Sequence, residues 1–198
     1  MNLPNAITLS RIPTMFVIAW LMYCHWTGAA LLAFVLFLAA AGGDWIDGYL
    51  ARSRGQITAF GKLMDSLADK IMVLGLVIAF VGHPRENIWM PLALITLVRE
   101  FLVTGMRMVA ASKGIIVAAD RGGKSKTVTQ LVALGFLLLA PAVGRDLSVF
   151  AGRDFGGWSW DIHQIGEGIF WIGTFLAVWS GWRYIVQFKD VVFAEAGQ

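Results

Sequence analysis

The sequence is poor in charged residues. Only 15% of its 198 residues are Asp, Glu, Lys or Arg, whereas 58% are hydrophobic and the mean hydropathy is +0.68. Soluble domains contain about 25% charged and about 45–50% apolar residues. The shortage of charge therefore excludes an ordinary soluble domain and predicts an integral membrane protein. The net charge of +3 is small, and the basic residues are spread along the chain. Nucleic acid is therefore not an expected partner.

Other absences narrow the class of protein further. The single cysteine, Cys24, excludes an intrachain disulfide and is expected to be a small packing residue. The histidines His25, His83 and His163 do not cluster, so we do not expect them to bind a metal. The N-terminus lacks the basic cluster and cleavage site of a signal peptide, so we expect it to be retained. No internal repeat is evident, which counts against an inverted-repeat transporter.

Six apolar segments are long enough to cross a bilayer as helices. We therefore predict an all-α polytopic membrane protein in which residues 1–198 form a single domain. Residues 1–11 are more polar and are expected to form a short amphipathic helix on the membrane surface, bracketed by Pro4 and Pro13. The six predicted segments are Ile12–Trp26, Ala29–Leu50, Phe60–Val81, Ile88–Ser112, Lys124–Val143 and Ile165–Phe188.

The basic residues near the segment ends divide unequally between the two sides of the membrane. One side carries Arg11, Arg52, Arg54, Lys62, Lys113, Arg121, Lys124, Lys126 and Lys189. The other side carries Arg85, Arg145 and Arg153. The positive-inside rule places the first side and both termini in the cytoplasm. We expect a bacterial-type inner membrane, with membrane lipids around the protein.

Four aspartates interrupt the apolar chain around the connection between the second and third segments. Asp44 and Asp47 are three residues apart and Asp65 and Asp69 are four apart, so each pair falls on one helix face. A helical hairpin would bring both pairs together at the cytoplasmic surface, where their mutual repulsion calls for bound cations. Hard divalent ions such as Mg²⁺, Mn²⁺ or Ca²⁺ favour such all-oxygen sites. The alternative, a solvated acidic face, is disfavoured by the apolar flanks.

A second group of charges is basic. Arg99, which lies beside Glu100, and Arg107 are at membrane depth, eight residues apart and roughly on one helix face. They either hold a phosphate or pair with Glu100 or with the aspartates, since a charge at this depth needs a partner. Lys124 and Lys126 follow two glycines at a helix start, where they form either an anion site or a basic membrane flank.

The aspartates belong to a longer motif. Asp44-x2-Asp47-Gly48-x2-Ala51-Arg52-x8-Gly61-x3-Asp65-x3-Asp69 matches every fixed position of the signature of the CDP-alcohol phosphotransferases, which the chain resembles. The N-terminal stretch NLPNAITLSRI, the spacing of Arg99 and Arg107 and the run Gly-Lys-x-Lys-Thr are similar to the phosphatidylglycerophosphate synthase branch. The resemblance implies the fold of that family. It also implies transfer of a phosphatidyl group from CDP-diacylglycerol to glycerol 3-phosphate, with release of CMP. We also expect a homodimer.

The resemblance implies a role for each motif residue. Two divalent ions, Mg²⁺ or Mn²⁺, would be held by Asp44, Asp47, Asp65 and Asp69. Asp69 would also be the catalytic base that takes the proton of the incoming hydroxyl. The implied CDP-binding residues are Asp44, Asp47, Gly48, Ala51, Arg52, Gly61 and Asp65. The expected acceptor-phosphate residues are Arg99, Arg107, Lys124 and Lys126.

Two other functions stay open at this point. The same scaffold could use a different acceptor, such as an inositol phosphate. A divalent-cation transporter or channel could instead use the aspartates as its ion site. Metal-dependent release of CMP would favour the enzyme, and uptake of metal into liposomes would favour the transporter.

Overall fold

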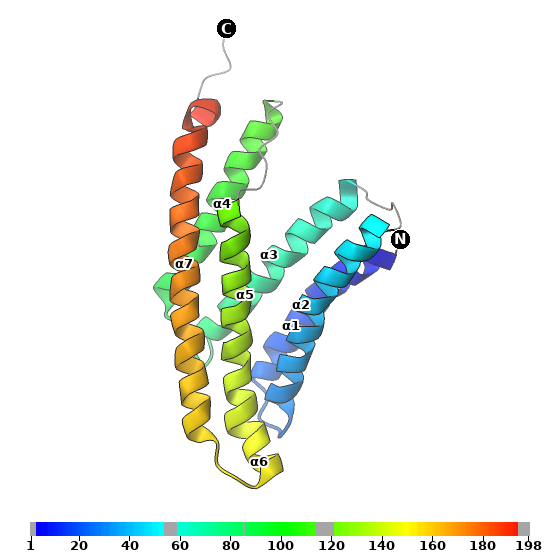
Figure 1. Cartoon of the computed structure of the whole chain (residues 1–198), viewed down its shortest axis with the longest axis vertical. Coiled ribbons are helices and arrows are strands. Elements are labelled where there is room, and N and C mark those ends of the chain that lie inside the picture. Colours follow the sequence, from blue (N-terminus) through cyan, green and yellow to red (C-terminus); the bar gives the residue numbers. More distant parts are fainter. Residues whose placement is uncertain (1–2, 54–58, 85, 114–120, 194–198) are drawn as a thin grey trace.

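The computed structural model consists of helices joined by short connections (Figure 1). It describes residues 3–53, 59–84, 86–113 and 121–193, but not the side chains of residues 3–8, 44–53, 59–63, 65, 66, 121–124 and 188–193. The helices are α1 (Leu3–Met22), α2 (Ala29–Ser53), α3 (Ala59–Val81), α4 (Met90–Ser112), α5 (Arg121–Pro141), the π-helix η1 (Ala142–Leu147), α6 (Ser148–Ala151) and α7 (Gly156–Phe193).

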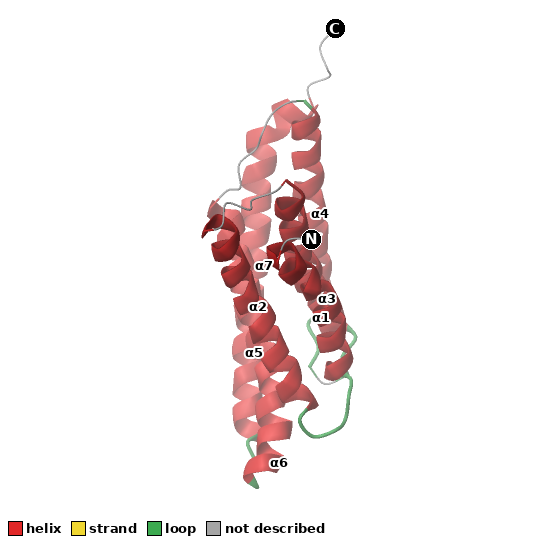
Figure 2. Cartoon of the chain, turned by 90° about the vertical axis from the view of Figure 1, so that its right-hand side faces the viewer, coloured by secondary structure: helices red, strands yellow, loops and turns green. Residues whose placement is uncertain are grey.

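The long helices run along the length of the molecule, as two perpendicular views show (Figures 1 and 2). The most extensive contacts join α5 to α7, α1 to α2, α1 to α3 and α4 to α7. The tight connection between α1 and α2 contains Gly28, whose φ of 103° lies in the left-handed region that favours glycine. Helices α2 and α3 are joined at the end of the molecule where α1 begins (Figure 1).

The all-α class predicted from the sequence is confirmed, and each predicted segment overlaps one long helix. Several of the ends differ. In the described residues, α1 runs without a break from Leu3 to Met22 and contains Pro13. The predicted short surface helix is therefore not separate from the first segment. Helix α5 ends at Pro141 and leads into η1. Helix α7 begins at Gly156, well before the predicted start at Ile165.

The main apolar core lies in the half of the molecule remote from the α2–α3 connection. Its buried members come from α1, α2, α3, α4, α5 and α7, so one cluster holds the long helices together. A second and much smaller cluster joins α4 to α7 in the other half and consists of Val103, Met106 and Tyr184. Representative side chains of the main core are Ile18, Phe37, Leu76, Phe80, Leu134 and Phe170.

The outer surface of the bundle is rich in large apolar side chains. Phe16, Phe101 and Phe175 are 63%, 66% and 68% exposed, respectively, and many others are similarly uncovered. Within the described residues, Ser125–Ala151 and Gly156–Gln187 are long and apolar enough to cross a bilayer. A water-facing protein rarely exposes so much apolar surface, whereas a lipid-facing one must. These features indicate a membrane protein.

Candidate functional site

The backbone places the four motif aspartates on two helices that are joined directly. Asp44 and Asp47 lie in the second half of α2, whereas Asp65 and Asp69 lie in the first half of α3. Both stretches are near the same end of the molecule (Figures 1 and 2). Of the four side chains, only that of Asp69 is described. The structure does not describe the side chains of the other motif residues. These positions are Asp44, Asp47, Ala51, Arg52 and Asp65, together with the two glycines, Gly48 and Gly61.

Asp69 forms an ion pair with α1. The Nη1 atom of Arg11 lies 2.8 Å from Asp69 Oδ1, and the side chain of Arg11 is only 4% exposed, against 40% for Asp69. The two residues, together with Thr127, help to line a cavity of about 30 Å³ whose other walls are apolar. The carboxylate thus has a buried positive charge on one side while it remains open to the surface.

Sequence reasoning treated Arg11 only as a basic residue near a membrane end and missed its contact with Asp69. A signal was present in the spacing. Arg11, Met15, Ile18 and Met22 are all buried and recur every three or four residues, so they share one face of α1. An arginine on the face that packs against α3 needs an acidic partner there, because an unpaired buried charge is costly.

The ligand preference of the implied divalent ions can be compared with the side chains present at this site. The carboxylate of Asp69 is accessible and already pairs with the cation of Arg11. It therefore attracts positively charged groups. Carboxylate oxygens on two consecutive helices are the donor type that Mg²⁺ and Mn²⁺ prefer. Among the described residues alone, no three His, Cys, Asp or Glu side chains come together. The type of donor, carboxylate oxygen, suits a divalent ion, and Asp69 is the one motif carboxylate whose side chain is described.

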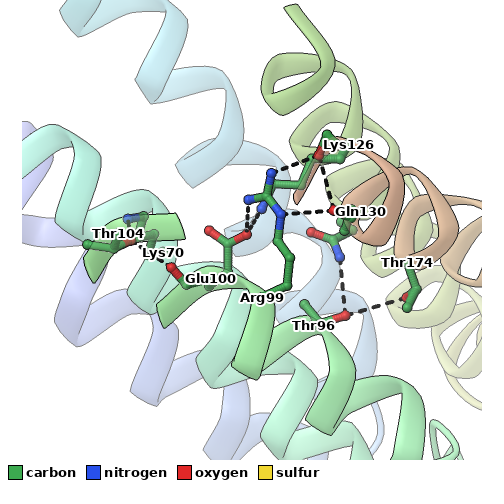
Figure 3. Close-up of polar contacts among 10 residues, drawn as sticks. Lys70, Thr96, Arg99, Glu100, Thr104, Lys126, Gln130 and Thr174 are labelled. Atoms are coloured by element: carbon green, nitrogen blue, oxygen red, sulfur yellow. Dashed lines mark hydrogen bonds and ion pairs between the residues drawn. The ribbon is translucent and has the colours of Figure 1, made fainter. Parts of the chain in front are cut away.

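Two of the four predicted phosphate-binding residues converge on one carboxylate (Figure 3). Arg99 Nη1 lies 2.7 Å from Glu100 Oε1, and the ammonium group of Lys126 pairs with the same oxygen. The side chain of Lys126 is 6% exposed and that of Glu100 is 11% exposed. Pairing with Glu100 was one of the two alternatives that the sequence left open for Arg99, and the structure shows that pairing.

Arg99 is also fastened to α7. Its Nε donates to the carbonyl oxygen of Ala177 at 3.0 Å, and its Nη2 donates to Ser180 Oγ at 2.8 Å. Helix α7 approaches so closely that a Cβ atom at Gly181 would lie 3.2 Å from Arg99 Cγ. The guanidinium is therefore held at a fixed position by two helices.

Arg107 and Lys124 differ from the other two predicted residues. The guanidinium of Arg107 lies over the ring of Tyr184, 5.5 Å from its centroid, in a cation–π contact. Its Nε atom is buried and has no hydrogen-bond partner among the described residues. The side chain of Lys124, at the start of α5, lies outside the described residues. The structure thus brings Arg99 and Lys126 together and leaves Arg107 with hydrogen-bonding capacity.

Several polar residues that sequence reasoning did not single out complete this region (Figure 3). Lys70 donates to Thr104 Oγ1, and Thr104 donates in turn to the carbonyl oxygen of Glu100. Gln130 Nε2 donates to Thr96 Oγ1 at 3.4 Å. The missed signal was periodic, because Thr96, Glu100 and Thr104 recur at four-residue intervals and so share one face of α4.

The described side chains of this region carry an excess of positive charge. Its described cations are Lys70, Arg99, Arg107 and Lys126, and its described anion is Glu100, which leaves four positive charges against one negative charge. The cations are close enough to repel one another. Uncompensated charge inside a helical bundle is expensive, so a region of this kind is suited to an anionic ligand.

A second polar region lies at the opposite end of the bundle. The buried carboxylate of Asp146 pairs with Arg145 at 3.0 Å and accepts the N–H of Leu31 at 2.8 Å. Glu86 pairs with His163 at 3.0 Å. A cavity of about 220 Å³ adjoins these groups and has largely apolar walls. Among the described residues here, each of the two carboxylates has a basic partner.

Comparison with known proteins identifies a family. Residues 1–179 match the model of the CDP-alcohol phosphatidyltransferase family. A Bacillus subtilis (strain 168) protein named CDP-diacylglycerol--glycerol-3-phosphate 3-phosphatidyltransferase is 37% identical over 195 residues, which cover 92% of this chain and 93% of that protein. Proteins of the same name from Rickettsia typhi and Shigella flexneri are 36% and 30% identical, over 95% and 93% of this chain and 97% and 93% of their own lengths.

The resemblance drawn from the aspartate motif and the two comparisons agree over most of the chain. The match includes α2 and α3, which carry the motif, and also α4 and α5, which carry the basic cluster of Arg99, Arg107 and Lys126. The chain therefore belongs to the CDP-alcohol phosphatidyltransferase family.

Proposed function

We propose that the protein transfers the phosphatidyl group of CDP-diacylglycerol to sn-glycerol 3-phosphate, giving phosphatidylglycerophosphate and CMP. The observation that carries this proposal is the excess of positive charge beside Asp69, which suits an acceptor that bears a phosphate. The names of the relatives support the same pair of substrates. A free amino alcohol such as choline would instead favour acidic or aromatic groups.

The chemistry assigned to Asp69 is proton transfer. Its carboxylate takes the proton of the acceptor hydroxyl, and the oxygen attacks the phosphorus of the phosphatidyl group. The bond from that phosphorus to the bridging oxygen breaks, and CMP leaves with the electron pair. Arg11 holds the carboxylate in place through its contact at 2.8 Å. Arg52 is assigned to the pyrophosphate, which its planar guanidinium can bind in bidentate fashion.

We assign two divalent ions, Mg²⁺ or Mn²⁺, to the four motif aspartates. When bound, such ions neutralise the charge of the pyrophosphate and of the departing CMP. Gly48, Ala51 and Gly61 are small enough to let the nucleotide approach the backbone. The metal ligands assigned are Asp44, Asp47, Asp65 and Asp69.

The acceptor phosphate is assigned to Arg99, Arg107, Lys124 and Lys126. Glu100 keeps Arg99 and Lys126 in place by pairing with both. Because the pair of cations exceeds the single carboxylate in charge, attraction for a phosphate remains. An inositol phosphate would satisfy the same charges, so the acceptor is identified by assay rather than by charge alone.

We further propose six membrane crossings in an inner membrane, with the aspartates facing the cytoplasm, and a homodimer. The exposed apolar surface and the asymmetric basic residues support the crossings and their direction. Single cysteines at Ser53 and Ser159 in a Cys24→Ala background should react from opposite sides of sealed vesicles. Reaction of both from one side would refute this topology.

The test of the reaction uses purified protein with CDP-diacylglycerol and a panel of acceptors. We expect release of CMP only with added Mg²⁺ or Mn²⁺, and fastest with glycerol 3-phosphate. Preference for an inositol phosphate would replace the acceptor and keep the family chemistry. No CMP release, together with metal uptake into liposomes that contain only this protein, would support the transporter instead.

A further inference from the structure

Two adjacent residues of α3 face different partners. Asp69 contacts Arg11 on α1, whereas the next residue, Lys70, contacts Thr104 on α4. Consecutive residues on an α-helix point roughly 100° apart, and their Cα atoms are about 3.8 Å apart. The proposed proton acceptor and Lys70 therefore extend from the same turn of α3, the first toward α1 and the second toward α4.

The described surroundings of Lys70 do not offset its charge. Its ammonium group donates to a neutral hydroxyl, that of Thr104, and no carboxylate in the described part of the chain pairs with it. The nearby carboxylate of Glu100 already pairs with Arg99 and Lys126. The charges of Arg107 and Arg99 act on Lys70 as well and repel it. Among the described residues, the charge of Lys70 is thus not offset by a carboxylate, which suits it to an anionic ligand.

We propose that Lys70 binds the phosphate of the acceptor and requires that phosphate to lie only a few bonds from the attacking hydroxyl. The inference rests on the proposed function and deepens it. A phosphate monoester carries about 1.5 to 2 negative charges near neutral pH, enough to offset much of the excess of this region. When the phosphate contacts Lys70, the hydroxyl of a small phosphorylated polyol falls beside Asp69. An unphosphorylated alcohol would gain no affinity from Lys70.

The decisive variant is Lys70→Met, which keeps an unbranched side chain and removes the charge. We expect the KM for glycerol 3-phosphate to rise about tenfold to a hundred-fold, as for the loss of one charged hydrogen bond. The Kd of radiolabelled glycerol 3-phosphate, measured by equilibrium dialysis with Mg²⁺ and without CDP-diacylglycerol, should rise by a similar factor. The KM for CDP-diacylglycerol should change little. Lys70→Arg should recover most of the affinity.

The matched control is Lys113→Met, which removes an exposed lysine at the end of α4. It should leave both KM values unchanged. Thr104→Val is a second variant that keeps the lysine but removes its hydroxyl partner, and it should raise the acceptor KM by a smaller factor than Lys70→Met. An unchanged KM for CDP-diacylglycerol in both variants shows that the fold is intact.

The outcomes separate the two proposals. If wild-type protein releases CMP with glycerol 3-phosphate while Lys70→Met keeps the wild-type KM and Kd, the role of Lys70 is wrong and the proposed function stands. If Lys70→Met weakens both substrates equally, the lysine is structural and the inference is again wrong. If wild-type protein does not use glycerol 3-phosphate, the proposed function fails and the inference fails with it.

Discussion

The two halves of the helical bundle are filled with different kinds of side chain. In the half remote from the α2–α3 connection, Leu76, Phe80 and Leu134 are fully buried in one continuous apolar cluster. In the other half, the buried side chains include Arg11 and Lys126, and the apolar cluster is small. The first half holds the helices together through close packing, and the second presents charge to a ligand.

This difference indicates that stability and function depend on different halves of the bundle. Packing in the apolar half does not depend on any ligand, because its side chains satisfy one another. The charged half holds buried groups that are costly unless paired, and Arg99 and Lys126 there share the single carboxylate of Glu100. Substitutions in the apolar half should therefore act mainly on the free energy of unfolding. Substitutions in the charged half should act mainly on turnover.

The largest effect on turnover is expected from Asp69→Asn. The amide keeps the shape of the side chain and cannot take the acceptor proton, so kcat should fall by about 10²–10⁴-fold or more. Thermal unfolding should change little. Asp161→Asn, at an exposed position on α7, is the control and should keep the wild-type kcat. A kcat for Asp69→Asn within threefold of wild type would end the assignment of the base.

Glu100→Gln should lower stability most among the charged residues. Loss of the carboxylate leaves Arg99 and Lys126, whose side chains are 12% and 6% exposed, without their shared partner. Breaking a buried pair in this way costs about 3–5 kcal/mol of unfolding free energy. Thermal unfolding in detergent measures the loss, with Glu167→Gln as control. Glycerol 3-phosphate should raise the Tm of the variant more than that of wild type. Equal protection would show that no anion binds at these cations.

Phe80→Ala tests the apolar half. Its side chain is fully buried, so its truncation should cost about 3–5 kcal/mol and lower the Tm. Below the new Tm, the KM for both substrates should stay at the wild-type value. The control Phe101→Ala, at a side chain that is 66% exposed, should have a much smaller effect on unfolding. A selective loss of acceptor affinity in Phe80→Ala would contradict the separation of the two halves.

Arg11→Ala should have the smallest of these effects. The contact with Asp69 is open to solvent on the acid's side, since Asp69 is 40% exposed, so we expect a loss of kcat of about tenfold or less. The KM for glycerol 3-phosphate should not change. Arg11→Lys should restore part of the kcat, and Arg183→Ala, at an exposed arginine of α7, should behave as wild type. A rise in KM without a loss of kcat would show that Arg11 binds substrate instead.

The sequence allowed much of the fold and part of the site to be predicted. Long apolar runs determine where helices form, so α2, α3 and α4 were located to within a few residues. The motif spacing led to Asp69 and the charge pattern led to Arg99 and Lys126. Which cation meets which carboxylate depends on how separate helices pack, and no local pattern records that. The contacts of Arg11 and Lys70 were missed for this reason.

The bonds of Arg99 have a mechanical consequence. This side chain ties α4 to α7 through Ala177 and Ser180, while Lys126 and Glu100 tie α5 to α4. The three helices thus form a rigid frame that is cross-linked at the level of the basic cluster. If the site widens to admit a lipid and narrows again without breaking these bonds, the moving part must be the other three long helices. The hinge then lies among α1, α2 and α3, and it carries Asp69 and Lys70 together toward or away from the stationary cations Arg99, Arg107 and Lys126.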